Sequence, residues 1–560
     1  MTTLVRFSGL LILSLLCLLR APAARGQAPI LSQLHVIGTS PIPGSVVLGG
    51  IAVDPSGNVY TSGTFFGSLR LGATTLVSTG FDDIFIAKQD PAGTYLWAVR
   101  AGGTSGEMSP QLALDGANNL YLASQTQSNA CTFGALSLNT SDADVVVAKL
   151  TPTGRFLWAT AGGNRRLTAP GGSTEVHGVA VTSEGEVCLT GTFTGSDRFG
   201  TTTFSSQLDT GISGSLSVDV YVARLDGAGA WRWALNAGTR SNELARGIAV
   251  DRAGNAYFTG AFGDNTGFAL GTTVLYTGVD GSDIFVAKLS PAGDVLWAVK
   301  AGAPEAGSEG RGVALDAQGN IYVTGYFAGN AHFGTQTVSA SAHADLFLAK
   351  LDATGTFLWA TGVAGADYET GDALAVAGND VFVGGSYFGA TTMGSSTLPY
   401  AGSRDLFIAQ FNTSGTFYGA VGGGGSDQEN LTALASDGHT AVYAGGYSLS
   451  PSITFGTTTL PGSRFVNTSF MTRVTGTVTA LGTTGGRPAA GGLVAWPNPA
   501  RGGTFQIAGG APGQPLRVYN GQGRLVRVYT STAAGALDLT LPPGLYLLRS
   551  GPHSTRLVVE

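Results

Sequence analysis

Charged residues are scarce in this chain. They make up 12% of its 560 residues, against about 25% in ordinary soluble domains. The formal net charge is only −6, so the chain lacks the basic surface that attracts nucleic acid or anionic membranes. We therefore expect no nucleic-acid partner and no electrostatic attachment to a membrane.

Cysteine and histidine are also rare. Of the three cysteines, Cys17 lies in an N-terminal apolar segment, and Cys131 and Cys188 fall at different positions of different repeats. We favour free, buried thiols for the latter two, with a disulfide as the alternative. The six histidines show no HxH or HxxxH spacing, which leaves a zinc site built from neighbouring ligands without support.

Glycine and one repeated phrase are what the chain has in abundance. Glycine accounts for 86 residues, and DIFIAKQDPAGTYLWA at 83–98 returns at 144–159, 219–234, 283–298, 345–360 and 405–420, with a degenerate copy at 469–474. Upstream of the copies lies an apolar hairpin pattern, such as GIAVDPSGNVYTSG at 50–63. In DPSGN, Asp opens the turn, Pro presets φ and Gly takes the position that needs a positive φ. Each unit therefore reads as four strands, and we count seven units.

These units need closure to be stable. A lone hairpin is marginal in water and an open sheet exposes edge strands, whereas four-stranded units repeated around an axis form a β-propeller. We predict an all-β fold with a seven-bladed β-propeller over residues 27–481, in which LHVIG at 34–38 pairs beside 469–474 and seals the ring. A right-handed β-helix is the competing repeat fold, although its shorter rungs would lack paired hairpin turns.

The repeated phrase resembles the SBBP family of β-propeller repeats. The likeness is carried by DIFIAK, by the Gly and Trp of GTYLW, by FG before a Thr-rich stretch, and by GIAVD followed by GN. It covers roughly residues 34–481 and is specific because it recurs. It implies the propeller fold and identifies no ligand.

The N-terminus has the features of a targeting segment. Arg6 provides a short basic region, LLILSLLCLL at 10–19 is an apolar stretch too short to span a bilayer, and small residues follow at 21–28. We predict that residues 1–26 are a signal peptide and that the mature chain is exported. Large residues precede Cys17, which argues against a lipoprotein.

A separate module follows a Thr-, Gly- and Ala-rich linker at 482–492. Apolar strands alternate with Gly and Pro turns over 493–560, which predicts a small C-terminal β-sandwich. Its pieces resemble the type A sorting domain of the type IX secretion system, and the likeness is carried by Pro497, Asn498, Pro499, Gly523, Gly544 and Tyr546. The resemblance implies the type IX machinery as a partner and a mature protein that is extracellular, either secreted or attached to the outer cell surface.

One tryptophan column could suggest sugar binding, but its position favours packing. The residues are Trp97, Trp158, Trp233, Trp297 and Trp359. A residue repeated in nearly every unit usually fills the space between neighbouring units, so we interpret the column as structural.

An enzyme site would break the symmetry of the repeats. The longest unit carries His177, Asp197, Arg198 and Asp209, which would suit a hydrolase, although polar residues scattered in long loops explain them equally. No catalytic or cofactor-binding residue is assigned. We favour an exported binding or structural protein with a glycan or protein ligand over the alternative, a secreted hydrolase or lyase acting on polysaccharide.

A glutamate precedes the first strand in six units. The residues are Glu107, Glu175, Glu243, Glu309, Glu369 and Glu429. If the first strand is innermost, these carboxylates lie near one mouth of the axial channel, where oxygen ligands would suit Ca²⁺. The favoured alternative is that each glutamate caps its own local turn.

Overall fold

The protein is built from β-strands, as expected. The computed structural model describes residues 29–476 except 39–44, 142–143, 164–171, 207–215, 264–266, 278–280, 304–305, 342, 364, 366, 440 and 465, together with 494–496, 504–508, 515–520, 524–529, 537–542, 544–550 and 553–559. These residues contain strands and no helix, and therefore no helix long and apolar enough to cross a membrane. The chain divides into two units, Met1–Val478 and Thr479–Glu560.

Seven antiparallel sheets, each with a core of four strands, make up the described part of the first unit. The innermost strands are β2 (Val46–Val53), β8 (Glu107–Leu114), β14 (Thr174–Val181), β20 (Leu244–Val250), β26 (Ser308–Leu315), β32 (Glu369–Ala377) and β38 (Glu429–Ser436). The second strands are β3 (Val59–Phe65), β9 (Leu120–Thr126), β15 (Val187–Thr194), β21 (Ala256–Phe262), β27 (Ile321–Phe327), β33 (Asp380–Tyr387) and β39 (Ala441–Ser448).

The two outer strands come from the repeated phrase in six sheets, and in the closing sheet the outermost strand is the N-terminal β1. The third strands are β6 (Asp83–Gln89), β12 (Val145–Leu150), β18 (Val218–Leu225), β24 (Asp283–Leu289), β30 (Asp345–Leu351), β36 (Asp405–Asn412) and β42 (Thr468–Thr475). The outermost strands are β7 (Tyr95–Gly102), β13 (Phe156–Gly162), β19 (Trp231–Ala237), β25 (Val295–Gly302), β31 (Phe357–Val363), β37 (Phe417–Gly424) and β1 (Ile30–Val36).

The excursion between second and third strands is a short hairpin. The seven hairpins are β4–β5 (Ser68–Leu71, Thr74–Val77), β10–β11 (Ala130–Phe133, Leu136–Asn139), β16–β17 (Ser196–Phe199, Thr202–Ser205), β22–β23 (Phe268–Leu270, Thr273–Leu275), β28–β29 (Asn330–Phe333, Gln336–Ser339), β34–β35 (Thr391–Met393, Ser396–Leu398) and β40–β41 (Ser452–Phe455, Thr458–Pro461). β10, β28 and β40 extend the preceding sheet by pairing with β7, β25 and β37.

The turns form as their residues predict. Asp54 Oδ1 accepts hydrogen bonds from the backbone N of Ser56 (3.0 Å) and Asn58 (2.9 Å), and Gly57 has φ +79°. The second hairpin repeats this arrangement around Asp90 and Gly93. A side-chain acceptor together with a left-handed glycine stabilises a tight turn, so local chemistry sets the hairpins.

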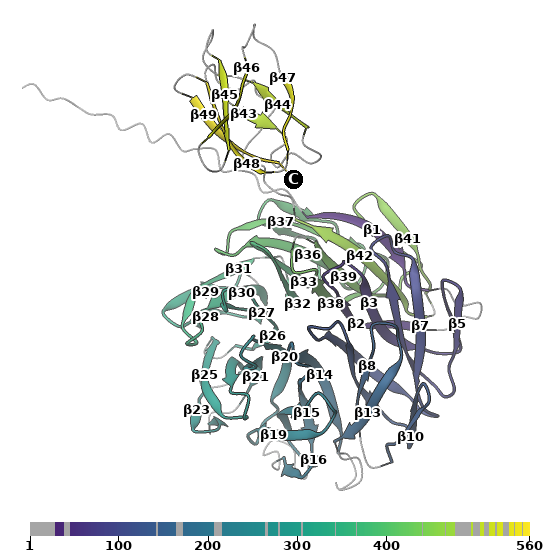
Figure 1. Cartoon of the computed structure of the whole chain (residues 1–560). Coiled ribbons are helices and arrows are strands. Elements are labelled where there is room, and N and C mark those ends of the chain that lie inside the picture. The colour runs from purple at the N-terminus through teal and green to yellow at the C-terminus, as the bar shows by residue number, and fades with distance from the viewer. Residues whose placement is uncertain are drawn as a thin grey trace, which may run out of the picture. The chain divides into compact units, whose positions relative to one another are not determined.

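The sheets surround a common axis, and the ring is closed. Each innermost strand contacts the innermost strands of its two neighbours, and β38 contacts β2 (Figure 1). β1 pairs antiparallel with β42, from Ile30 opposite Thr475 to Val36 opposite Phe470. The predicted pairing of the N-terminal segment with 469–474 is confirmed, and the closing sheet combines both ends of the ring.

Tryptophans join neighbouring sheets, which confirms the structural interpretation of that column. Trp97 covers Gly154 in the next sheet and donates Nε1–H to the carbonyl of Pro152 at 3.0 Å. Trp158, Trp233 and Trp297 make the same contacts one sheet further along each time. Cys131 and Cys188 are buried and free, as favoured.

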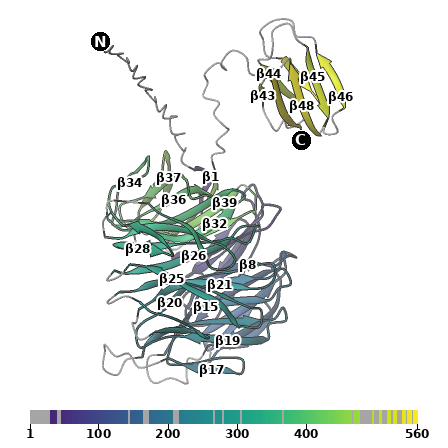
Figure 2. The same cartoon turned by 90° about the vertical axis from the view of Figure 1, so that its left-hand side faces the viewer.

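The described residues of the second unit form two sheets. One has the order β43 (Val494–Trp496), β44 (Thr504–Ala508), β47 (Leu537–Thr540), and the other β46 (Leu525–Tyr529), β45 (Leu516–Asn520), β48 (Gly544–Ser550), β49 (His553–Val559) (Figure 2). Leu516, Val518, Leu548 and Leu557 form its buried cluster.

The predicted sorting residues fall in and around these strands. Gly544 begins β48, and Tyr546 is buried, with its hydroxyl donating to the carbonyl of Pro542 at 3.0 Å. Pro497, Asn498, Pro499 and Gly523 lie outside the described residues, as do Asp209 and the predicted signal peptide.

Candidate functional site

Every innermost strand carries a β-bulge at the same level. Its pairing with the second strand slips by one residue there, which re-aims one side chain. The residues at the slip, in sheet order, are Gly49, Pro110, His177, Arg246, Arg311, Asp372 and Thr432. Four consecutive sheets thus place an ionisable side chain where the other three place Gly, Pro or Thr.

An axial cavity lies at this level. Its volume is about 190 Å³, and residues from all seven innermost strands line it. His177, Arg246 and Asp372 are among them. The ionisable lining residues therefore come from β14, β20 and β32, whereas β2, β8 and β38 line the cavity with uncharged residues, among them Gln111 and Thr432.

The ionisable side chains form a row across three sheets. Arg246 Nε donates to Glu309 Oε1 at 2.8 Å, and Arg311 Nη2 donates to Glu309 Oε2 at 3.2 Å. Arg311 Nη1 also donates to Asp372 Oδ1, and Arg404 Nη2 lies 3.8 Å from Asp372 Oδ2. We call these five residues the axial charge row. Burial would raise the pKa of Glu309, but Arg311 and Arg246 outweigh it and hold the pKa below its usual value.

His177 extends this arrangement to a fourth sheet. Its Nε2 lies 3.2 Å from Thr192 Oγ1 and 3.5 Å from Glu175 Oε2. Burial, followed by the positive charge of Arg246, lowers the His177 pKa to about 4. The imidazole is therefore neutral at pH 7 and can accept a proton or a hydrogen bond.

The six predicted glutamates occupy two environments. Glu175 and Glu309 lie two residues before the bulge and join the axial site, through His177 and the arginines. The other four lie three residues before it and are fully buried: Glu107, Glu243, Glu369 and Glu429. Successive side chains of a strand point to opposite faces. A difference of one residue in position therefore places the two sets of glutamates on opposite faces of their strands.

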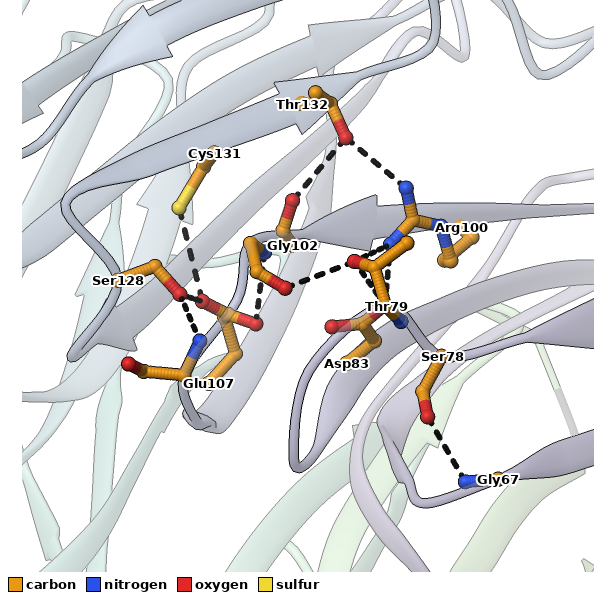
Figure 3. A network of polar contacts seen from close by, with 12 residues as sticks. Gly67, Ser78, Thr79, Asp83, Arg100, Gly102, Glu107, Ser128, Cys131 and Thr132 are labelled. Atoms are coloured by element: carbon orange, nitrogen blue, oxygen red, sulfur yellow. Dashed lines mark hydrogen bonds and ion pairs between the residues drawn. The ribbon is translucent and has the colours of Figure 1, made fainter.

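Three of the buried glutamates cap local turns, as the favoured alternative expects. Glu107 accepts hydrogen bonds from Ser128 Oγ (2.7 Å) and Thr126 Oγ1 (3.0 Å) through Oε1, and from the backbone N of Gly103 (3.2 Å) through Oε2 (Figure 3). Glu243 is bonded to Thr239 in the same manner, and Glu429 to Gly425 and Ser448.

An aspartate of the preceding sheet lies beside these glutamates. Asp83 and Glu107 both approach Gly102, and Asp83 is held by Arg100 and by the backbone N of Thr79 (Figure 3). Asp219 beside Glu243, and Asp405 beside Glu429, occupy the same place.

Burial raises the pKa of these carboxyl groups. The pKa of Asp219 rises to about 7 and that of Glu243 to about 8, and burial followed by Glu429 raises that of Asp405 to about 7. No cluster of three or more His, Cys, Asp or Glu suited to a metal ion occurs in the described part of the chain. Calcium binding by these glutamates stays a prediction.

The polar residues of the longest unit do not assemble into one site. Asp197 is buried and accepts a hydrogen bond from Thr174 Oγ1 at 3.0 Å, and burial raises its pKa to about 6. Arg198 lines a separate cavity of about 330 Å³ next to Trp231. Among the members of that group that the structure describes, only His177 lines the axial cavity.

Sequence reasoning missed Arg246, Arg311 and Asp372. The available signal was the residue just before each apolar first-strand segment, which reads His, Arg, Arg and Asp in four consecutive units. A repeat position that carries an ionisable residue in only some units is not explained by the scaffold that all units share.

Comparisons with known proteins support the repeat assignment. Residues 296–326, which contain Glu309 and Arg311, match the SBBP β-propeller repeat. An uncharacterised WD repeat-containing protein of Acanthamoeba polyphaga mimivirus is 27% identical over 161 residues, which are 26% of this chain and 11% of that protein. The chain therefore spans about a tenth of that relative.

Solved structures of two lyases are also similar in part. Virginiamycin B lyase from Staphylococcus aureus, an inactive variant with quinupristin, is 9% identical with a TM-score of 0.33, covering 79% of this chain and 99% of its own. Polysaccharide lyase Uly1 is 11% identical with a TM-score of 0.37, covering 81% and 95%. Likeness at this level carries no argument about ligand or reaction. The chain is thus an all-β protein with an SBBP-type β-propeller repeat.

Proposed function

We propose that this protein is an exported binding protein of the cell surface whose ligand binds at the axial site. The observation that carries the proposal is the asymmetry of the bulge residues. The turns and tryptophans keep the same residue types from sheet to sheet, as a scaffold requires, whereas the bulges place His177, Arg246, Arg311 and Asp372 on one side of the axis. Polar groups on one side of the axis of an otherwise repetitive scaffold suit recognition.

The size of the cavity defines what it can hold. Sites for drug-sized ligands measure about 300–1,000 Å³, and the axial cavity of about 190 Å³ is smaller. It therefore accommodates the end or a projecting group of a larger ligand. Arg246 is about a third exposed and can offer its terminal guanidinium nitrogens to that group.

Export rests on the two ends of the chain. The apolar segment at 10–19 and the sorting-like module at 493–560 support delivery by the type IX secretion system, with a final location outside the cell. A protein in that location meets glycans and proteins, and both are candidate ligands.

A polysaccharide lyase is the second candidate, because His177 is neutral and lies close to Arg246. A neutral imidazole can remove the proton next to a sugar carboxylate while a guanidinium neutralises that carboxylate. The C–C double bond then forms as the glycosidic C–O bond breaks, and the departing sugar oxygen takes a proton from the imidazolium or from water. Incubation with uronate-containing polysaccharides, followed by absorbance of the unsaturated product, tests this candidate. Turnover that Arg246→Met and His177→Ala abolish would favour it over simple binding.

The binding proposal is tested with matched arginine variants of the full chain. Binding to an array of glycans and surface proteins is measured for the parent, for Arg246→Met, and for Arg232→Met. Arg232 is 61% exposed on the outermost strand β19 and pairs with Asp226, away from the axis. We expect Arg246→Met to lose the ligand and Arg232→Met to keep it. A ligand that binds all three proteins equally, or the absence of any ligand, would contradict the proposal.

A further inference from the structure

Four planar side chains lie in contact between the fifth and sixth sheets. The His343 and Tyr368 rings are stacked, with centroids 5.2 Å apart and planes 9° apart. Tyr368 meets Phe388 edge to face at 6.3 Å, and Arg404 Cζ lies 5.5 Å from the centre of the Phe388 ring. His343 Nδ1 is also 2.8 Å from Asp367 Oδ1. We call His343, Tyr368, Phe388 and Arg404 the aromatic platform.

The platform is continuous with the axial charge row. Arg404 belongs to both, through its ring contact with Phe388 and its 3.8 Å approach to Asp372. Arg311 joins Asp372 to Glu309, and Arg246 leads on to the cavity. A continuous chain of side-chain contacts therefore links the axial cavity to Tyr368.

Tyr368 is an exception among its equivalents. The residues at the same place in the other sheets, four residues before the bulge, are Ser45, Gly106, Ser173, Asn242, Gly307 and Gln428. Tyr368 is 45% exposed. An exposed aromatic that only one of seven equivalent positions carries is not explained by the packing that the repeats share.

The backbone holds Tyr368 in place. Its carbonyl accepts a hydrogen bond from Phe388 N at 3.2 Å, and Glu369 N donates to the carbonyl of Ala344 at 2.9 Å. The main chain that carries the ring is therefore held in place, and the ring itself is packed by His343 and Phe388, which reduces the entropy lost on binding.

The chemistry of this surface matches an uncharged sugar chain. An aromatic face is electronegative and attracts the C–H groups on the flat face of a sugar ring. The guanidinium and carboxylate groups of the charge row donate and accept hydrogen bonds side by side, as neighbouring sugar hydroxyls do, and charged partners strengthen such bonds.

The balance of charge argues against an acidic chain. Arg246, Arg311 and Arg404 are accompanied by Glu309, Asp372 and, at the platform, Asp367. The surface therefore has no excess of positive charge to attract a polyanion.

We propose that the aromatic platform and the axial charge row together bind an uncharged polysaccharide, with one sugar ring on the platform at Tyr368 and a chain end directed to the axial cavity. This inference rests on the proposed function, since it specifies the ligand of the same site.

The test uses the full chain with soluble β-glucan and mannan as uncharged probes and alginate as the acidic probe, at low and high NaCl. The variants are Tyr368→Ala and Tyr368→Phe, with Tyr276→Ala as the control because Tyr276 is 55% exposed elsewhere. We expect binding of an uncharged probe that is insensitive to salt. Tyr368→Ala should weaken it about tenfold or more, while Tyr368→Phe and Tyr276→Ala stay within about twofold. Equal melting temperatures show that each variant is folded.

The outcomes separate the two proposals. If Arg246→Met abolishes glycan binding and Tyr368→Ala does not, the proposed function stands and the platform is refuted. If only alginate binds, and its binding weakens with salt, the ligand is not an uncharged polysaccharide, although the axial site still stands as the binding site. If none of the three polysaccharides binds, the saccharide inference is wrong, whereas a protein ligand lost in Arg246→Met would still support the axial site.

Discussion

Replacing Glu243 by glutamine should stabilise the protein at alkaline pH. Glu243 is fully buried beside Asp219, and its pKa rises from 4.5 to about 8 because burial disfavours the charged form. The folded state therefore binds a proton that the unfolded state has already lost above about pH 4.5. Glutamine has the shape and the donor and acceptor pattern of the protonated acid, and it keeps the hydrogen bonds to Thr239.

The size of the effect follows from linkage. The protonated Glu243 side chain makes its full contribution to the free energy of unfolding below pH 4.5. This contribution is lost as the pH rises toward 8, because the unfolded state releases its proton earlier than the folded state. At 1.36 kcal/mol per pH unit, the loss in the parent is on the order of 4 kcal/mol at pH 8. The Glu243→Gln variant avoids this loss, so its advantage over the parent should be small at pH 4.5 and largest above pH 8.

Thermal melting from pH 4.5 to 9 measures this prediction, with Glu309→Gln as the matched control. Glu309 is also buried, but its pKa is lowered because Arg311 and Arg246 outweigh burial. The ionised Glu309 side chain stabilises the folded state above about pH 4.5, and this stabilisation is lost at lower pH. We therefore expect Glu309→Gln to lower the free energy of unfolding by about 3 kcal/mol at pH 7. A Glu243→Gln variant less stable than the parent at pH 8, or equal effects of both substitutions across the range, would refute the reasoning.

Three further predictions concern the ring, its export and its ions. Deleting 30–36 removes the outermost strand of the closing sheet and exposes β42 as an edge, so the melting temperature should fall sharply; an unchanged value would contradict closure by this pairing. Deleting 493–560 should leave the protein in the periplasm by cell fractionation, and normal surface levels of the truncated chain would disprove the sorting assignment. Calorimetric titration of the parent with Ca²⁺ tests the favoured structural role of the glutamates, which predicts no heat and no rise in melting temperature; heat that a variant with Gln at 243, 309 and 369 loses would instead support a calcium site.

Much of the fold was predictable because its determinants are local and repeat. Asp54 and Gly57 specify a turn within five residues of chain, and the tryptophan column identifies the contact between sheets. Closure was also predictable, since 34–38 resembles the last strand of a unit and a ring leaves one strand to be supplied by the other chain end.

The site was harder to predict because it depends on register. Six glutamates at similar distances from an apolar strand look equivalent in sequence. A shift of one residue moves a strand side chain to the opposite face, so Glu309 reaches the axis while Glu243 is buried between sheets. Sequence marks the column that holds Arg246 and Arg311 but does not show that a bulge turns it toward the axis, and the charge row joins residues more than sixty positions apart.

Hydrogen–deuterium exchange of the full chain, with and without a saturating uncharged glycan, tests the central claim most directly. The axial site and the aromatic platform predict protection in peptides covering 240–247, 306–312, 367–374 and 386–388, where the bulges and Tyr368 lie. Binding at the axis would be contradicted if these four segments showed no protection, or if protection were confined to the short hairpins between second and third strands, such as 66–77.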